Sequence, residues 1–375
     1  MLASSLGAAA VASLATPHIA SAQPAPRDDI AESLLRDMVQ WKVPGASYAV
    51  IANGQVSLHA AGVRRAGSTF AVTPQTMFQA ASLSKTVAAA VALVLVERGQ
   101  LTLDHDINDH LTVWKLPSAA LAEGHPVTLR RLLAMTGGIN VPGYPGYRPG
   151  SPLPSLVQIL NGAPPANSAA VRIVEPPGTK EIYSGGGYQI VQAAIDSATR
   201  ARFARVARDT VLVPAGMTVS GFDQPLLSER ATNVAAGHTL AGTAMTGGGN
   251  VLPELAAAGL WSTPAELARF LIALWQARRS TPGALLTPAT IDTMLTPVDG
   301  FGYGLGAALR GRGRDLVLMK RGHNIGFHSY MMLFPDTGQG AVVMTNVESG
   351  DRVIEPLLRR IAERDAWPPF GPLAD

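Results

Sequence analysis

Hydrophobic runs near the N-terminal end of the chain predict a strand hairpin. Residues 46–51 and 56–61 are strand-like, and the segment between them contains Asn53-Gly54. Asn-Gly readily adopts the left-handed backbone conformations that a two-residue hairpin turn requires. The pattern therefore predicts a β-hairpin over residues 46–61.

The next apolar stretch is typical of a buried helix. Residues 82–97 are dominated by Ala, Val and Leu and have almost no polar side, which predicts a helix inside the protein core. Gly99 follows directly and marks the helix end.

The middle of the chain, from about residue 104 to 297, predicts helices joined by long loops. Its connections are rich in Pro and Gly, as in residues 141–146. The clearest helix start is Thr263-Pro264-Ala265-Glu266, a capping box with proline at the first helical position, followed by apolar residues at helical spacing.

Strand patterns return after Pro297 and predict an antiparallel meander followed by an amphipathic helix over residues 351–364. Turns are expected at residues 311–314 and 335–338. The expected strands are residues 303–309, 316–320, 329–334 and 341–345.

These elements together predict an α/β fold of the α+β type, with one antiparallel sheet built from both chain ends and flanked by helices. We expect one domain over residues 23–375. Its α/β lobe would comprise residues from about 30–85 and 298–375, and its mostly helical inserted lobe residues from about 86–297. A cleft between two such lobes is a common place for a ligand site.

Composition restricts the class of protein. The 375 residues are 47% hydrophobic and 15% charged, so the chain has enough apolar surface to form a core. The net charge of +3 is scattered, without a basic block that could track nucleic acid. The absence of cysteine excludes disulfides, thiolate nucleophiles and Cys-ligated zinc.

The N-terminal residues predict export. Residues 6–15 form a short apolar run, and Ala20-Ser21-Ala22 fits a small-residue cleavage site. The run is too short to span a bilayer and leads into Pro24 and Pro26. We therefore expect a signal peptide over residues 1–22, no stable membrane span, and a periplasmic or secreted protein.

The first candidate for chemistry is Ser82-Leu83-Ser84-Lys85, an S-x-x-K tetrad at the start of the predicted buried helix. Residues three apart lie on one helix face, so the Lys85 amine can reach the Ser82 hydroxyl. Serine needs a neighbouring group to take its proton, and burial favours the neutral form of a lysine. The alternative is that Ser82 only caps the helix and Lys85 is solvated.

Two further segments carry candidate residues. Tyr183 precedes Ser184 and three glycines, whose small size allows close approach of a ligand. Lys320-Arg321-Gly322-His323 ends a predicted strand, where a backbone amide can bind an oxyanion beside a cation. Read singly, the first is a core tyrosine and the second a solvated basic pair.

Together the three segments resemble the serine hydrolases that include class C β-lactamases, D-alanyl-D-alanine peptidases of penicillin-binding type and family VIII carboxylesterases. That family's order is S-x-x-K, Y-x-N, then K-T-G or H-x-G. This chain has Ser82 with Lys85, then Tyr183, then Lys320 with Gly322. The resemblance extends from about Ala31 to the last predicted helix.

The resemblance implies Ser82 as nucleophile, Lys85 and Tyr183 as the proton-transfer pair and Lys320 as the cation of the third motif. The backbone amides of Ser82 and His323 would form the oxyanion hole. An alternative register places His323 in the H-x-G role. Gly185 stands where β-lactamases usually carry asparagine, which removes one hydrogen bond to a β-lactam substrate.

The sequence thus predicts a serine hydrolase that cleaves small carboxylic esters through an acyl-enzyme, without cofactor or metal. Amides or β-lactams are the second choice of substrate, which would make it a β-lactamase or D-Ala-D-Ala peptidase. A catalytically silent penicillin-binding-like receptor is the alternative from another class. No nucleic acid partner is expected, and the oligomeric state stays open.

Overall fold

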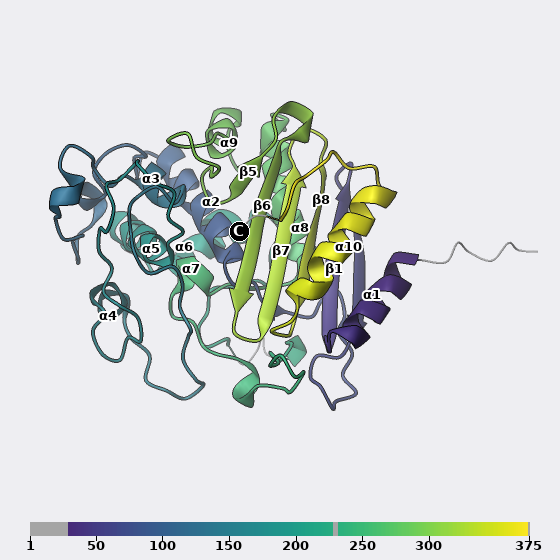
Figure 1. The fold of residues 1–375 in the computed structure, drawn as a ribbon. Helices are drawn as coiled ribbons and strands as arrows, with labels where there is room; N and C mark the ends of the chain where they lie inside the picture. The colour runs from purple at the N-terminus through teal and green to yellow at the C-terminus, as the bar shows by residue number, and fades with distance from the viewer. Residues whose placement is uncertain (1–28, 228–231, 374–375) are drawn as a thin grey trace, which may run out of the picture.

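The computed structural model describes residues 29–227 and 232–373 and has an antiparallel sheet of six strands (Figure 1). The expected signal peptide lies outside the described residues. The strand order is β2-β1-β8-β7-β6-β5, so strands from both chain ends form one sheet, as predicted. The strands are β1 Gly45–Ala52, β2 Gln55–Gly62, β5 Ala308–Arg310, β6 Val317–Asn324, β7 Phe327–Phe334 and β8 Gln339–Thr345.

The predicted N-terminal hairpin is confirmed. Strands β1 and β2 pair in register from Gly45 with Gly62 to Ala52 with Gln55. Asn53 and Gly54 both have positive φ, 50° and 74°, as a two-residue turn of this kind requires.

The prediction of a strand over residues 303–309 is wrong for most of its length, because only β5, Ala308–Arg310, forms there. Gly304 approaches the Met294 carbonyl and Gly306 has φ of 103°, so the backbone bends instead of extending. As a result β5 pairs only with residues 317–319 of β6.

Helices cover both faces of the sheet (Figure 1). Helices α1, Asp29–Gln40, and α10, Asp351–Arg364, pack on one face through a core cluster that includes Leu34 and Leu357. Helix α8, Pro264–Arg278, packs on the other face against β1 and β8. Helix α10 occupies the residues predicted for the last helix, 351–364.

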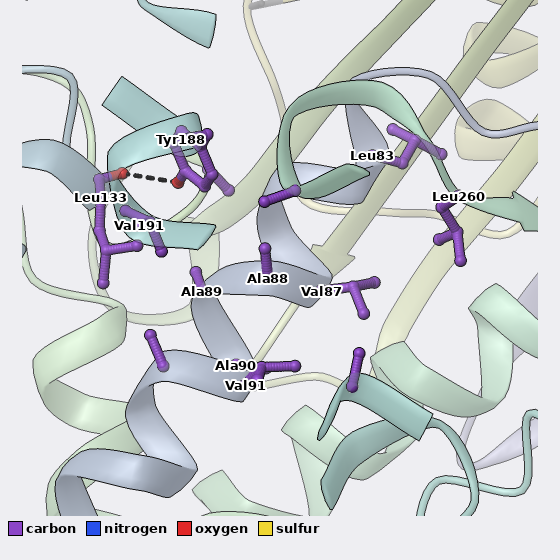
Figure 2. Packing of buried hydrophobic residues seen from close by; sticks show 14 of the residues in the cluster. Leu83, Val87, Ala88, Ala89, Ala90, Val91, Leu133, Tyr188, Val191 and Leu260 are labelled. Atoms are coloured by element: carbon purple, nitrogen blue, oxygen red, sulfur yellow. Dashed lines mark hydrogen bonds between the residues drawn. The ribbon is translucent and has the colours of Figure 1, made fainter. Parts of the chain in front are cut away.

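Helix α2, Leu83–Glu97, runs through the larger core, as predicted (Figure 2). Thirteen of its residues, Leu83 to Leu95, are buried, and Gly99 follows its C-cap with φ of 68°. The Tyr188 hydroxyl, in the same core, donates to the Leu133 carbonyl at 3.0 Å. The core around α2 thus joins the sheet to the helical part of the chain.

The remaining elements lie between β2 and β6 along the chain. The helices are α3 Leu129–Leu133, α4 Leu156–Asn161, α5 Gly185–Thr199, α6 Phe203–Ala207, α7 Leu255–Ala258 and α9 Pro288–Met294. Strands β3 Phe78–Gln79 and β4 Trp261–Ser262 form a second small sheet. Single turns of other helix types are η1 Ile107–His110, η2 Ala120–Ala122, η3 Arg208–Leu212, η5 Thr246–Gly248 and η6 Gly313–Asp315.

The capping box predicted at the start of α8 is half right. The Thr263 side chain accepts a hydrogen bond from the Glu266 amide, as an N-cap does. The Glu266 carboxylate does not return to Thr263 but accepts from the Val219 amide and from the Ser220 amide and hydroxyl. A tertiary contact therefore replaces the local one. Within the described ranges, no helix is both long and apolar enough to cross a membrane.

Candidate active site

Ser82 lies at the turn into α2, in a backbone that is held tightly. The preceding residue, Ala81, has φ of 51°, a left-handed conformation that a non-glycine residue rarely adopts. The Ser84 hydroxyl donates to the Ala81 carbonyl at 2.5 Å and accepts from the Leu260 amide. The Ser84 hydroxyl is thus used in hydrogen bonds that hold the backbone, whereas the Ser82 side chain makes no capping hydrogen bond.

The Lys85 amine points at Ser82. Its Nζ donates to Ser82 Oγ at 3.0 Å and to the Ala257 carbonyl, just before the end of α7, at 2.8 Å. Lys85 is only 1% exposed, which excludes a solvated lysine. Burial, and secondarily the nearby Lys320, holds the pKa of Lys85 well below its usual value. Lys85 can therefore act as a neutral base toward the Ser82 hydroxyl.

Tyr183 lies between two lysines. Its ring centroid is 5.1 Å from Lys85 Nζ and 4.6 Å from Lys320 Nζ. Lys320 is fully buried, and its Nζ is also 5.8 Å from the Tyr303 ring. The three predicted motifs therefore converge on one place, although they are far apart in sequence.

Strand β6 brings its open edge against the turn before α2. A side chain at Gly322 would lie 2.5 Å from the Ala80 carbonyl, so only glycine allows this approach. On the neighbouring strand, the Ser329 hydroxyl donates to the same carbonyl at 2.8 Å. Gly322 and Ser329 together hold β6 beside Ser82.

The register of the β6–β7 hairpin decides what His323 contributes. Asn324 pairs with Phe327 across a two-residue turn, and His323 pairs with His328. In an antiparallel ladder alternate pairs exchange hydrogen bonds, so the His323 amide points away from β7 toward the open edge. Its imidazole projects to the sheet face opposite Gly322. The structure therefore places the Lys320 side chain, and only the His323 backbone, at the site.

Gly185 is packed against an aromatic ring. A side chain at this position would meet the Tyr144 ring at 3.0 Å and the Pro142 carbonyl at 3.2 Å. Burial, and secondarily the nearby Glu254 carboxylate, raises the pKa of Tyr144 well above its usual value. Tyr144 thus fills the space that an asparagine at position 185 would need.

Sequence reasoning missed several residues of this site. Asn324 donates to the Gln79 side chain at 2.8 Å and to the Ala258 carbonyl at 3.2 Å, which ties β6 to the segment before Ser82. The alternation of side chains along a strand could have indicated Asn324, because Lys320, Gly322 and Asn324 share one face of β6. Nothing local marks Tyr144 or Ser329, since both reach the site from separate parts of the chain.

The sequence profile described as Beta-lactamase matches residues 31–365. The chain therefore belongs to the beta-lactamase family of serine hydrolases. Among curated proteins it is similar to penicillin-binding protein 4 of Amycolatopsis lactamdurans, with 30% identity over 47% of this chain and 44% of that protein. It is also similar to protein flp of Staphylococcus aureus (strain N315), with 25% identity over 61% of this chain and 43% of that protein. The matched segment spans less than half the length of these relatives.

Solved structures show the same fold. A crystal structure of SurE with D-Leu superposes with a TM-score of 0.72 and 23% identity, covering 93% of this chain and 78% of that one. The octameric penicillin-binding protein homologue from Pyrococcus abyssi superposes with a TM-score of 0.73 and 22% identity, covering 92% of this chain and 78% of that one. At these identities the likeness establishes the fold and not the reaction.

Proposed function

We propose that this chain is an exported hydrolase that cleaves small carboxylic esters through an acyl-enzyme on Ser82. The contact between Lys85 Nζ and Ser82 Oγ, made by a buried lysine whose pKa lies well below its usual value, carries the proposal. Ser82 Oγ attacks the ester carbonyl while Lys85 and Tyr183 take its proton. The same pair protonates the leaving alcohol, and water then releases the acid.

The backbone amides of Ser82 and His323 supply the oxyanion hole in this mechanism. Both amides belong to rigid backbone, because Gly322 and Ser329 hold β6 against the turn at Ala80. Donors fixed in this way need no reorganisation when charge develops on the carbonyl oxygen.

Tyr144 and Gly185 support esters over β-lactams as substrates. An acylamino side chain gains from a hydrogen-bonding partner such as asparagine, and Gly185 offers none. The Tyr144 ring also occupies the space beside Gly185. An ester without an acylamino group loses nothing at this position.

A β-lactamase or D-Ala-D-Ala peptidase is the second candidate, and the buried Lys320 beside Tyr183 favours it. A lysine in this place can bind a substrate carboxylate. SurE, a neighbour in fold, is described with D-Leu bound, which is also a carboxylate-bearing molecule. A silent penicillin-binding-like receptor would share the fold without an activated serine.

One experiment separates these functions. Fluorophosphonate labelling followed by mass spectrometry tests for an activated serine, and we expect the adduct on Ser82. A panel of p-nitrophenyl esters, D-Ala-D-Ala peptides and nitrocefin then ranks the substrates by kcat/KM. An adduct on Ser84 or Ser184 refutes Ser82 as the nucleophile. No adduct at all favours the function of a silent penicillin-binding-like receptor.

A further inference from the structure

Three potential metal ligands meet on the sheet face opposite Ser82. His323 lies on β6, His328 pairs with it on β7, and Glu348 follows β8. Each offers one ligand atom, and these atoms all lie within 4.8 Å of one another. The cluster shares His323 with the third motif, but the imidazoles of His323 and His328 project to the face of the sheet opposite Gly322.

The ligand types favour zinc. Two imidazoles and one carboxylate are a common protein ligand set for Zn²⁺, with a fourth position left for water. The His323 side chain is 47% exposed, so water can reach an ion held there. Without sulfur, and with two nitrogen ligands, the set suits Zn²⁺ and related transition metals better than Mg²⁺ or Ca²⁺.

Glu348 is already oriented for this role. Its Oε1 lies 2.7 Å from His323 Nε2, and its Oε2 accepts a hydrogen bond from the Gly326 amide at 2.6 Å. Hydrogen bonds to a ligating carboxylate fix its direction and strengthen metal binding. We propose that His323, His328 and Glu348 bind one divalent transition-metal ion, with Zn²⁺ as the best match.

Binding requires a limited change in the side chains. The two imidazoles are now stacked, with centroids 4.3 Å apart and an interplanar angle of 21°. Bonds of about 2.0–2.1 Å to a tetrahedral ion place ligand atoms roughly 3.3 Å apart, so His323 Nε2 and Glu348 Oε1, now 2.7 Å apart, must separate slightly while the two rings reorient around the ion. The half-exposed His323 has room for this rotation. Asp351 and Arg321, which carry opposite charges, also lie near His328.

The position of the cluster suggests a consequence that rests on the proposed function. His323 carries the backbone amide of the proposed oxyanion hole, and its imidazole is a proposed metal ligand. An ion that reorients the imidazole would therefore act on the strand end beside Ser82. We expect Zn²⁺ to change the hydrolysis rate as well as to bind.

Isothermal titration of untagged, EDTA-treated protein with ZnCl₂ tests the site directly. We expect one Zn²⁺ per chain in the unmodified protein, and at least tenfold weaker binding in Glu348→Gln and in His328→Phe. Glu348→Gln keeps a hydrogen-bond acceptor for Gly326, and His328→Phe keeps a ring stacked on His323. Thermal unfolding without metal verifies that both variants fold.

His125→Ala, which removes an exposed histidine elsewhere, is the matched control and should bind Zn²⁺ as the unmodified protein does. Ser82→Ala should also bind it unchanged, so failure of the proposed hydrolysis would not affect this result. Absence of binding to the unmodified protein, or equal affinity in Glu348→Gln and His328→Phe, overturns the proposal.

Discussion

Two regions meet near Tyr183: the turn into α2, residues 80–85, and the loop of residues 142–147, which packs on the start of α5. In the turn, a strained Ala81 and hydrogen bonds from Ser84 and Ser329 fix the backbone around Ser82. In the loop, the Tyr144 ring lies against Gly185, the position to which the resemblance assigns an asparagine in β-lactamases. The turn holds the proposed reactive groups, while the loop forms part of the proposed substrate wall.

This difference separates the chemistry from the choice of substrate. Groups that attack and transfer protons must keep their geometry for any acyl substrate, so little can vary there. A residue that lines the substrate pocket, such as Tyr144, affects only those substrates that contact it. Substitutions in the turn should therefore stop all hydrolysis, and substitutions in the loop should change the ranking of substrates.

The largest effect is expected from Ser82→Ala. Removal of a serine nucleophile should lower kcat for every substrate on the order of 10⁶-fold. Stability should hardly change, because the Ser82 side chain makes no capping hydrogen bond. Ester turnover and urea unfolding measure the two quantities. Retained turnover of any ester would show that the turn is not the reactive region.

Loss of the proton-transfer pair should come next. Lys85→Ala and Tyr183→Phe should each slow acylation by ~10²–10⁴-fold, and the double variant should lose far less than the product of both. Stopped-flow acylation rates measure this. Full activity in Tyr183→Phe would leave Lys85 as the only base.

The same lysine predicts the pH dependence of acylation. Because burial lowers the pKa of Lys85, the neutral base persists at pH values far below those of an ordinary lysine. The rate should therefore reach its plateau at a pH well below the pKa of a solvated lysine and fall as acid protonates Lys85. A rate that rises steadily up to the pKa of a solvated lysine, about 10.4, would contradict a buried neutral base.

The loop region should show a pH-dependent stability through Glu254, which lies near Tyr144. Burial raises the pKa of Glu254 from 4.5 to about 7, and its own backbone amide and the nearby Tyr147 offset part of that rise. Between these pH values the unfolded chain loses the proton while the folded chain keeps it. The free energy of unfolding should therefore fall by up to ~3 kcal/mol as pH rises from about 4.5 to 7.

Glu254→Gln should remove this part of the pH dependence and stabilise the protein above pH 7. Urea unfolding of both proteins across that pH range measures it. Asp196, whose pKa burial also raises to about 7, keeps its own contribution in both proteins and serves as an internal reference. If the free energy of unfolding of the variant depended on pH as strongly as that of the unmodified protein, a group other than Glu254 would be responsible.

The smallest effect concerns the substrate wall itself. Gly185→Asn alone should gain no β-lactam turnover, because Tyr144 occupies the space. Gly185→Asn combined with Tyr144→Ala should raise kcat/KM for nitrocefin relative to a short-chain ester by about tenfold, the value of one good hydrogen bond. Nitrocefin turnover that already equals ester turnover in the unmodified enzyme would put the β-lactamase function first.

The sequence by itself determined the elements that local chemistry dictates. Asn53-Gly54 specifies its turn, the apolar run after Ser82 specifies a buried helix, and the spacing of Ser82 and Lys85 puts both on one helix face. Tertiary structure alone decided the remainder. Glu266 left its local capping partner for Ser220, and glycines bent the chain where a strand was predicted before Ala308.

Only the folded chain shows that Tyr144 covers Gly185 and that Ser329 holds the backbone before Ser82. These contacts join residues that are 41 and 249 positions apart in the sequence. The periodicity of a sequence reports which face of an element is apolar, and it carries no record of which distant residue meets that face. The contact between Ser82 and Lys85 could therefore be predicted from spacing, whereas the walls around these residues depended on packing.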